Sequence, residues 1–525
     1  MGLPHGWVSY GPGTAGQAGA PPAGDGDARP ELADVRRLAR RLLHRAVSAA
    51  RAEENSIWHL LASHLGPGVA TLPVASGAWP QYDQVNVQAG LDAWLAEPGR
   101  SHQAVGITRF HHTMFGLADL TQPGLGPAQH GLGLASVSTD MLPSGPGGAT
   151  RPCVRCALYL VTDPAGPLVA LVQGTDEHSG QESVTVDVAC ADRERSEQVV
   201  DEIRRLAVEH NVFRGHVLAF GADVFGGGHP FTRIRRPLLS FLDRPGVGRD
   251  QVVLPPEVLD GIERQVLGVA RHAGRLLASG QHLKRGVLLH GAPGTGKTHT
   301  VRYLISELAG VTVLILSGDA LRMIAEACSV ARTLQPSLIV VEDVDLIAED
   351  RAARMGVQPL LFQLLNEMDG LGADLDVTFV LTTNRADLLE PALAQRPGRV
   401  DHAALLPLPD AEARRRLLRL YQGSLDLDLA EPGAAITRTE GVTASFLKEL
   451  LRRAALNAAD EAGGTTAPLR VTDAHLTAAL DELLDVGSQL TRVLLGASGG
   501  GQQGPRGADA VIGDPGQRPP SRPGQ

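Results

Sequence analysis

The sequence predicts an α+β N-terminal domain followed by an α/β domain with a parallel sheet and a C-terminal helical lid. Three observations support this prediction. Between residues 250 and 408, short apolar strands alternate with amphipathic helices, and a glycine-rich loop joins the first strand to the first helix. Beyond Leu408 the pattern is helical throughout. With 525 residues, the chain is long enough for about two to four domains, each with a sizeable core.

The overall composition is that of an ordinary soluble globular protein. Hydrophobic residues make up 43% and charged residues 20% of the chain, and the formal net charge is −10. This balance gives no general attraction to nucleic acid or to an anionic membrane. The start of the chain lacks a basic segment followed by an apolar core, and no apolar run approaches a membrane span. We therefore expect a cytoplasmic protein with no membrane segment and no clear nucleic-acid binding.

The two ends of the chain differ in composition from the rest. Residues 1–30 are rich in Gly, Pro and Ala, and residues 497–525 consist mainly of Gly, Gln, Pro and Arg. Such segments bury too little apolar surface to offset their ordering entropy, so both are expected to be disordered tails. The folded regions are then expected at 31–245 (the α+β domain), 250–408 (the α/β domain) and 409–487 (the lid).

The region 31–245 predicts an antiparallel sheet with helices. It opens with an amphipathic helix whose apolar face runs from Val35 to Val47. Strands are expected at 157–162, 168–173, 183–189 and 216–220, with a helix at 196–210 before the last strand. The histidines of this region are scattered and form no catalytic constellation, so its role stays open.

The four cysteines are too few for a disulfide framework in so long a chain. Cys153 and Cys156 form a C-x-x-C pair, but no second ligand pair accompanies it. Cys190 ends a strand-like run and Cys328 falls on the apolar side of a helix. Packing as small buried side chains is therefore the expected role of all four.

The region 250–408 alternates elements in the order typical of nucleotide-binding α/β folds. Strands are expected at 286–290, 311–316, 338–341 and 377–382, and helices at 298–308, 319–332 and 359–368. The loop after the first strand fits the pattern G-x-x-x-x-G-K-[ST] and consists of Gly291, Ala292, Pro293, Gly294, Thr295, Gly296, Lys297 and Thr298.

In that pattern the backbone N–H groups cradle phosphates, the lysine reaches the β- and γ-phosphates and the hydroxyl holds Mg²⁺. The helix N-terminus adds a favourable dipole for an anion. Only three of the 48 Lys and Arg residues are lysines, and one of them is Lys297. An ammonium is a compact charge on a thin stem, which a guanidinium cannot replace in a tight loop.

Polar residues follow the third and fourth strands. Glu342 and Asp343 end the third strand, where one carboxylate can serve Mg²⁺ and the other the attacking water. Asn384 follows the fourth strand and can bind a γ-phosphate or that water. Arg396 and Arg399 project from a Pro-Gly turn. Taken singly, each of these features also occurs in solvated turns.

Five segments in this order resemble the AAA branch of the AAA+ ATPases: GAPGTGKT, PSLIVVEDVDLI, LLFQLLNEMDGL, LTTNRADLLEPALAQRPGRVD and TEGVTASFLKELLRRAAL. The resemblance covers residues 250 to about 460. It implies a five-stranded parallel sheet with a helical lid, a ring that is usually a homo-hexamer, and hydrolysis of ATP with Mg²⁺ at subunit interfaces. By resemblance Asn384 is sensor 1, Arg396 and Arg399 are arginine fingers acting on a neighbour's ATP, and residues 441–445 are the second sensor region.

Two departures from the family pattern bear on activity. The family has Asp then Glu where this chain has Glu342 then Asp343, so by resemblance Glu342 takes the Mg²⁺ side and Asp343 activates water with a shorter arm. A misplacement of about 1 Å can cost roughly a hundredfold in rate, so this order is compatible with slow turnover, but loss of activity does not follow from it. Family members that thread polypeptides carry an aromatic pore loop between the second and third strands, whereas residues 317–337 contain no Phe, Tyr or Trp.

The sequence thus predicts a Mg²⁺-dependent ATPase that remodels a protein partner, unidentified by the sequence and chosen by the N-terminal domain. The Glu-Asp order motivates an alternative, a scaffold or switch that binds ATP and assembles but scarcely hydrolyses it. A third reading, a nucleic-acid remodelling ATPase, rests on basic clusters at 233–236 and 414–416, which are also typical of solvated faces.

Overall fold

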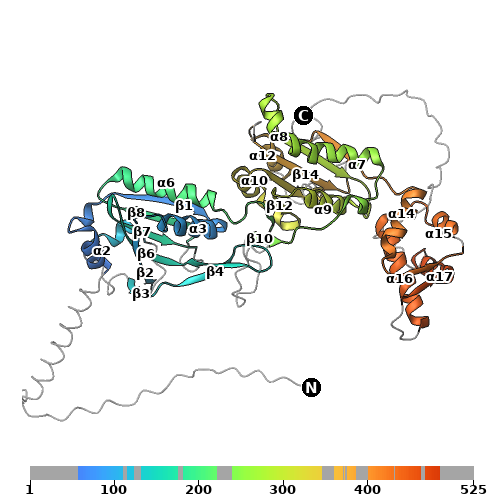
Figure 1. Cartoon of the computed structure of the whole chain (residues 1–525), viewed down its shortest axis with the longest axis horizontal. Helices are drawn as coiled ribbons and strands as arrows, with labels where there is room; N and C mark the ends of the chain where they lie inside the picture. Colours follow the sequence, from blue (N-terminus) through green and yellow to red (C-terminus); the bar gives the residue numbers. More distant parts are fainter. Residues whose placement is uncertain are drawn as a thin grey trace, which may run out of the picture.

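A computed structural model describes residues 57–109, 115–122, 132–175, 181–221, 239–345, 360–370, 372, 375–385, 400–430, 432–462 and 468–484. Along the chain, the described residues form a first domain with a six-stranded sheet, a second with a seven-stranded sheet, and a small domain of mostly helices (Figure 1). The predicted tails, the predicted helix at 35–47 and the basic cluster at 233–236 lie outside the described residues.

The first sheet is antiparallel throughout, with strand order β1-β8-β7-β6-β2-β3, which confirms the predicted antiparallel sheet. Its strands are β1 (Val74–Pro80), β2 (Ser101–Arg109), β3 (Leu132–Ala135), β6 (Cys156–Asp163), β7 (Gly166–Gln173) and β8 (Ser183–Ala189). A separate hairpin pairs β4 (Thr139–Pro143) with β5 (Thr150–Val154).

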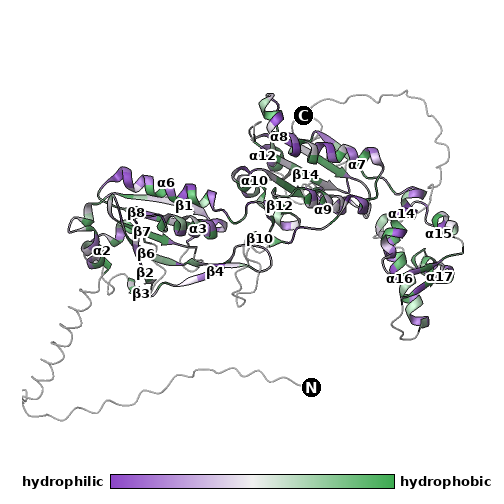
Figure 2. Cartoon of the chain, in the orientation of Figure 1, coloured by the Kyte–Doolittle hydropathy of each residue, from purple (hydrophilic) through white to green (hydrophobic). Residues whose placement is uncertain are grey.

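Helices cover both faces of this sheet. Successive residues of β6 point to opposite sides, so that Tyr159 and Val161 join one apolar cluster while Leu158 and Leu160 join another. The first cluster is completed by α3 (Gln84–Leu95) and α6 (Arg193–Glu209), and the second by α2 (Ile57–Leu65) and α4 (Leu117–Leu120). The outward side of α6 is polar (Figure 2). Burial on both faces explains why these strands read as continuous apolar runs.

The four cysteines all lie among the described residues, are buried and form no disulfide, which confirms their predicted packing role. Cys153 and Cys156, the C-x-x-C pair, contribute to different apolar clusters. Burial raises the pKa of the Cys153 thiol to about 12, so the thiolate is strongly disfavoured.

The second sheet has the order β10-β9-β12-β13-β14-β11-β15, and its last five strands in that order are parallel. They are β12 (Thr312–Leu316), β13 (Ser337–Val341), β14 (Val377–Thr383), β11 (Arg285–His290) and β15 (His402–Leu405). One face packs against α7 (Pro256–Glu263), the π-helical turn η5 (Arg264–Gly268) and α9 (Lys297–Glu307), and α8 (Val269–Ala278) continues the η5 turn. The other face packs against η6 (Gly318–Met323), α10 (Ile324–Thr333) and α12 (Leu360–Asp369).

The strand expected at 216–220 forms, but it belongs to the second sheet rather than to the first. As β9 (Val217–Phe220) it pairs in parallel with β12, and β10 (Leu239–Leu242) pairs antiparallel with β9 at the sheet edge. The prediction that placed this strand in the α+β domain is therefore wrong. A short apolar strand does not encode its partner, and here it covers the edge that β12 would otherwise expose.

The lid contains α14 (Ala411–Gln422), α15 (Pro432–Arg438), α16 (Ala444–Ala462) and α17 (Asp473–Leu484), whose apolar sides share one cluster. The expectation of a purely helical lid is wrong in one detail. A parallel pair, β16 (Asp426–Asp428) with β17 (Arg470–Thr472), joins the segment that follows α14 to the segment that precedes α17. Strands of three residues are too short to produce a readable period-2 pattern.

Candidate nucleotide-binding site

The glycine-rich loop connects the end of β11 to the start of α9, as predicted. Gly291, Gly294 and Gly296 have φ angles of 151°, 81° and 104°, which side-chain-bearing residues rarely adopt. A Cβ atom on Gly291 would lie 2.5 Å from the carbonyl oxygen of Leu406. The loop is also braced internally, since the Thr295 hydroxyl donates to the carbonyl of Ala292 at 2.9 Å. The backbone of the loop can therefore adopt this conformation only with glycines at these positions.

Lys297 is the first residue of α9 and is 6% exposed. Its Nζ donates to the carbonyl oxygens of Gly291 and Ala292 at 2.8 and 3.0 Å, so it lies across the inside of the loop. Burial lowers the pKa of Lys297, against the opposing effect of the Asp343 and Asp345 carboxylates. The loop thus holds one buried cation at a helix N-terminus, which is suited to a phosphate chain.

Thr298 and Glu342, the two predicted Mg²⁺ ligands, are brought together. Glu342 follows β13, and its N–H donates to the carbonyl of Leu316 on the neighbouring strand at 3.0 Å. Burial raises the pKa of Glu342, a hydrogen bond with Thr298 lowers it, and the charge of Asp343 raises it again. A hydroxyl and a half-buried carboxylate are oxygen donors that Mg²⁺ accepts, so the residues present fit the ion.

Asp343 and Asn384, from the ends of β13 and β14, also meet. The amide Nδ2 of Asn384 donates to Oδ1 of Asp343 at 3.4 Å, and the Asp343 N–H donates to Oγ1 of Thr382 at 3.1 Å. Within the described ranges, Asp343 is the one non-glycine residue with positive φ, at 53°. Asp tolerates this left-handed conformation better than most residues because its short side chain can hydrogen-bond locally. The local backbone therefore accommodates Asp at this position.

Asp345 is a site residue for which sequence reasoning found no role. It is 8% exposed and accepts hydrogen bonds from the Thr383 hydroxyl at 2.9 Å and from the Asn384 N–H at 3.3 Å. These bonds tie the end of β13 to the end of β14 and fix the backbone of Asn384. The signal in the sequence was a third acidic residue two positions after Asp343, opposite a strand that ends in two threonines.

Arg396 and Arg399 lie outside the described residues, so their role as arginine fingers stays a prediction.

The lid turn at 441–445 lies against the phosphate-binding loop. The Ser445 N–H and hydroxyl donate to the Gly294 carbonyl at 3.2 and 3.4 Å. A Cβ atom on Gly294 would lie 2.9 Å from Oγ1 of Thr443, so the close approach requires glycine. Sequence reasoning placed this turn near the nucleotide, and the structure brings it into direct contact with the loop.

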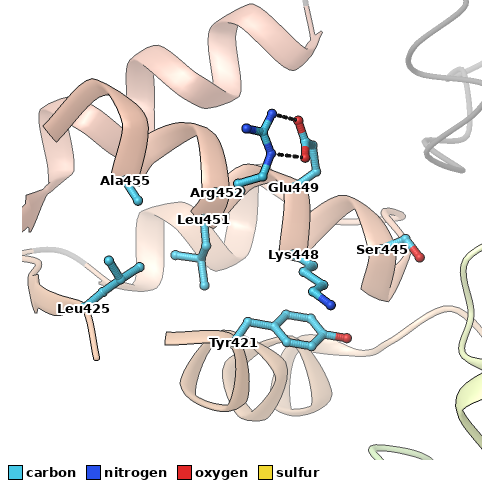
Figure 3. Close-up of a pocket in the computed structure, with 8 residues that line it drawn as sticks. All are labelled: Tyr421, Leu425, Ser445, Lys448, Glu449, Leu451, Arg452 and Ala455. Carbon is cyan, nitrogen blue, oxygen red and sulfur yellow. Dashed lines mark hydrogen bonds and ion pairs between the residues drawn. The ribbon is translucent and has the colours of Figure 1, made fainter. Parts of the chain in front are cut away.

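Ser445 also stands at the end of a lid pocket of about 380 Å³ between α14 and α16 (Figure 3). In this pocket the Nζ of Lys448 lies 6.0 Å from the centre of the Tyr421 ring, and Lys448 extends over that ring. Arg452 and Glu449, which also line this pocket, pair with each other on α16 (Figure 3). The pocket adds a mixed aromatic and cationic surface one turn along the helix from the loop contact.

Comparison with known proteins agrees with this geometry. Residues 287–408 match the sequence model of the family described as "ATPase family associated with various cellular activities (AAA)". This part of the chain belongs to the AAA family. The AAA match runs from β11 to just beyond β15, so it accounts for the parallel sheet and the site but not for the N-terminal domain.

Curated relatives match between about a third and a half of the chain. The chain is 34% identical over 270 residues to the ATP-dependent zinc metalloprotease FtsH 4 of Sphaerobacter thermophilus, covering 47% of this chain and 39% of that protein. It is 33% identical over 192 residues to a 26S proteasome regulatory subunit 8 homolog of Schizosaccharomyces pombe, covering 33% and 47%. It is 28% identical over 276 residues to the proteasome-activating nucleotidase of Methanosarcina mazei, covering 49% and 64%. The chain therefore spans less than two thirds of the length of each of these relatives.

Two further observations concern only the described ranges of the chain. No helix there is both long enough and apolar enough to cross a bilayer. No group of three or more His, Cys, Asp or Glu side chains within them could hold a metal ion.

Proposed function

We propose that the protein binds ATP and hydrolyses it with Mg²⁺, and that it uses the reaction to remodel a macromolecular partner. The observation that carries this proposal is the convergence of three groups at one edge of the parallel sheet. Lys297 follows β11, the Glu342 and Asp343 carboxylates follow β13, and Asn384 follows β14. In open α/β sheets, ligands bind at the carboxyl ends of the strands.

In this proposal the backbone amides of the loop and Lys297 bind the phosphates, while Thr298 and Glu342 would hold Mg²⁺. The ion, when bound, neutralises charge that develops on the transferred phosphoryl group. The Asp343 carboxylate accepts a hydrogen bond from the attacking water, and the Asn384 amide orients that water. Arg396 or Arg399 of a neighbouring subunit stabilises the negative charge of the transition state. Most of the rate then comes from positioning and charge rather than from covalent chemistry.

A homo-oligomeric ring, a hexamer by family resemblance, is part of this proposal because the arginines act between subunits. A cytoplasmic location and a protein partner chosen by the N-terminal domain also belong to it. In this proposal the segment between β12 and α10 does not hold the partner through an aromatic pore loop. Its apolar residues Ala320, Leu321 and Met323 are buried in the core rather than presented on a free loop.

A second candidate function is a nucleotide-dependent switch or scaffold, and one contact favours it. The Asn384 amide donates to the same Asp343 carboxylate that would have to accept from water. A carboxylate that this bond holds away from the water would slow hydrolysis without weakening binding of the phosphates at Lys297.

The two candidates are separated by measuring assembly and phosphate release in the same samples. The particle mass is followed by light scattering, and phosphate by a coupled assay, with and without Mg²⁺-ATP. We expect ATP-dependent assembly together with steady phosphate release above the background of Lys297→Ala. Assembly with phosphate release at that background would establish the switch instead. If neither assembly nor phosphate release depends on ATP, both candidates are wrong.

A further inference from the structure

Two segments lie near the end of α9 that is away from the phosphates. The outgoing segment, residues 211–216, joins the N-terminal domain to β9 of the AAA domain. The return segment, residues 243–248, lies within the AAA domain and follows β10. The helix α9 has eleven residues, so its ends are about 16 Å apart. Its first residue is Lys297, and its last turn contacts the return segment. One rigid element therefore spans the distance from the phosphate-binding loop to the interdomain connection.

Arg244 is the residue that joins these parts. One terminal nitrogen donates to the carbonyl oxygens of Ile305 and Leu308 at 2.6 and 3.0 Å, which are carbonyls at the C-terminal end of α9. The other donates to the carbonyls of Gly215 and Val311, both at 3.0 Å. A guanidinium is favourable at a helix C-terminus because it satisfies carbonyls that have no partner within the helix and complements the dipole. Here it also binds the outgoing segment through Gly215.

A second contact fixes the return segment to the same turn of α9. The Ser306 hydroxyl donates to the carbonyl of Pro245 at 2.6 Å and accepts from the N–H of Val247 at 3.0 Å. Two side chains, Arg244 and Ser306, thus hold the return segment to the C-terminal end of the helix, and Arg244 also binds the outgoing segment.

The outgoing segment is held on its other side by the N-terminal domain and by the sheet. The Val212 N–H donates to Oδ1 of Asn86 at 2.9 Å, and Asn86 is a buried residue of α3. The Gly215 N–H donates to Oγ1 of the buried Thr312 at 2.9 Å. The chain of contacts from α9 to α3 is therefore continuous, through Arg244, Gly215 and the bonded amide of Val212.

We propose that Arg244 is a positioning residue that couples the N-terminal domain to the nucleotide site, by fixing the distal end of the phosphate-binding helix to the outgoing segment, which carries that domain. This inference rests on the proposed function in one respect, since it requires a nucleotide to bind at Lys297. A shift of α9 on nucleotide binding moves the return segment directly and reaches Gly215 through Arg244, and the N-terminal domain moves with Gly215. By the reciprocity of coupled sites, a partner bound to the N-terminal domain also changes nucleotide affinity.

Four amides report on this coupling: Val212, Gly215, Val247 and Val313, whose N–H donates to the His216 carbonyl at 2.9 Å. Their hydrogen exchange is measured in the full chain with and without Mg²⁺ and a non-hydrolysable ATP analogue. Binding of a fluorescent ATP analogue is measured in the same preparations. Coupling free energies between sites typically correspond to about 5-fold to 150-fold effects, so we expect exchange to change about fivefold or more in the wild type.

The variants are Arg244→Met, which removes the four bonds, and Arg205→Met, a control that removes an exposed arginine on α6. In Arg244→Met the nucleotide still binds but the exchange of the four amides no longer responds, while Arg205→Met behaves as the wild type. Ser306→Ala removes the bonds that hold the return segment, and with it Arg244, against α9. It is expected to weaken the response at Gly215, and it serves if Arg244→Met does not fold.

Two results would overturn the coupling while leaving the proposed function intact. In the first, the analogue binds the wild type but the four amides exchange at the same rate with and without it. In the second, Arg244→Met or, if that variant does not fold, Ser306→Ala responds as the wild type does. Failure of the analogue to bind at all would contradict the proposed function, and the coupling with it.

Discussion

Lys297 illustrates how a single side chain depends on its local backbone. Its ammonium lies inside a loop whose three glycines have positive φ, and it is bonded to two carbonyls of that loop. A planar guanidinium has more donors than an ammonium but is also wider. The loop is tightly packed, since even a Cβ atom on Gly291 would clash with the carbonyl oxygen of Leu406. Charge alone is therefore insufficient at this position.

Replacing Lys297 by Ala or by Arg is expected to weaken ATP binding. Hydrogen bonds to charged groups contribute about 1.5–3 kcal/mol, which corresponds to roughly 10-fold to 150-fold in affinity. Equilibrium binding of a fluorescent ATP analogue measures this. Lys284→Arg is the matched control, because Lys284 directly precedes β11 and has no contact with the loop among its described bonds. Equal affinity in Lys297→Arg and the wild type would contradict the requirement for an ammonium.

The left-handed backbone of Asp343 makes a separate prediction about stability. A β-branched side chain in this conformation is strained by about 1–2 kcal/mol, whereas Asn tolerates it. Asp343→Val should therefore lower the thermal midpoint of the AAA domain, and Asp343→Asn should leave it close to that of the wild type. Calorimetry on the full chain measures both. A stable Asp343→Val protein would show that this backbone is not constrained.

At the scale of elements, the contact between the lid and the phosphate-binding loop depends on one glycine. Gly294 and Gly296 both have positive φ, but their surroundings differ. A Cβ atom on Gly294 would lie 2.9 Å from Oγ1 of Thr443, whereas a Cβ atom on Gly296 would meet none of the described residues within 4 Å. Both substitutions to Ala therefore incur backbone strain, and only Gly294→Ala also displaces Thr443 and Ser445.

Gly294→Ala is accordingly expected to release the bond from the Ser445 N–H to the Gly294 carbonyl. Exchange of the Ser445 amide should accelerate in Gly294→Ala and remain as in the wild type in Gly296→Ala. Amide exchange resolved to single residues measures this difference. If the Ser445 amide exchanges at the same rate in the two variants, the lid does not contact the phosphate-binding loop in solution.

A partly buried ion-pair network stabilises the N-terminal domain. Asp163 accepts from Arg195 at 2.6 Å, and Arg195 also pairs with Glu202 at 3.0 Å. Burial alone would raise the pKa of Asp163, but hydrogen bonds from Arg195 and from the Ala165 N–H outweigh it and hold that pKa below its ordinary value. The same balance of burial against bonds from Trp94 and Arg195 lowers the pKa of Glu202.

Because these pKa values are lowered on folding, their contribution is present above the ordinary range near pH 4 and is lost as the pH falls below it. Thermal unfolding between pH 7 and pH 3 should show this loss. Asp163→Asn should cost about 1–3 kcal/mol at pH 7 and flatten the acid dependence. Glu197→Gln, which breaks an exposed pair with Arg193, should do neither. If the stability of Asp163→Asn falls with pH as that of the wild type does, Asp163 does not contribute to the acid dependence.

At the scale of the whole molecule, the parts that sequence predicted well are those encoded by neighbouring residues. The loop at 291–298, the strands that end at Val341 and Thr383, and the helices of the lid follow from local spacing and periodicity. The five parallel strands required a family resemblance, since β15 is only four residues long. The parts that sequence missed depend on contacts between distant segments.

Three examples show this limit. The pairing of β9 with β12 joins residues that are far apart along the chain, and no pattern in either strand names the other. Asp345 acquires its role only because Thr383 and Asn384 end beside it. Nothing in the sequence distinguishes Arg244 from the other arginines, because its role depends on four carbonyl groups that only the fold brings next to it.

The central claim is that ATP bound at Lys297 is hydrolysed with the help of the Asp343 carboxylate. The most direct measurement is the rate of phosphate release at saturating Mg²⁺-ATP from the wild type and from Asp343→Asn, with ATP binding measured on both. General-base assistance typically contributes about 10²-fold to 10⁴-fold. We predict that Asp343→Asn binds ATP as the wild type does and releases phosphate at least about a hundredfold more slowly. Equal rates of phosphate release from the two proteins would contradict the claim.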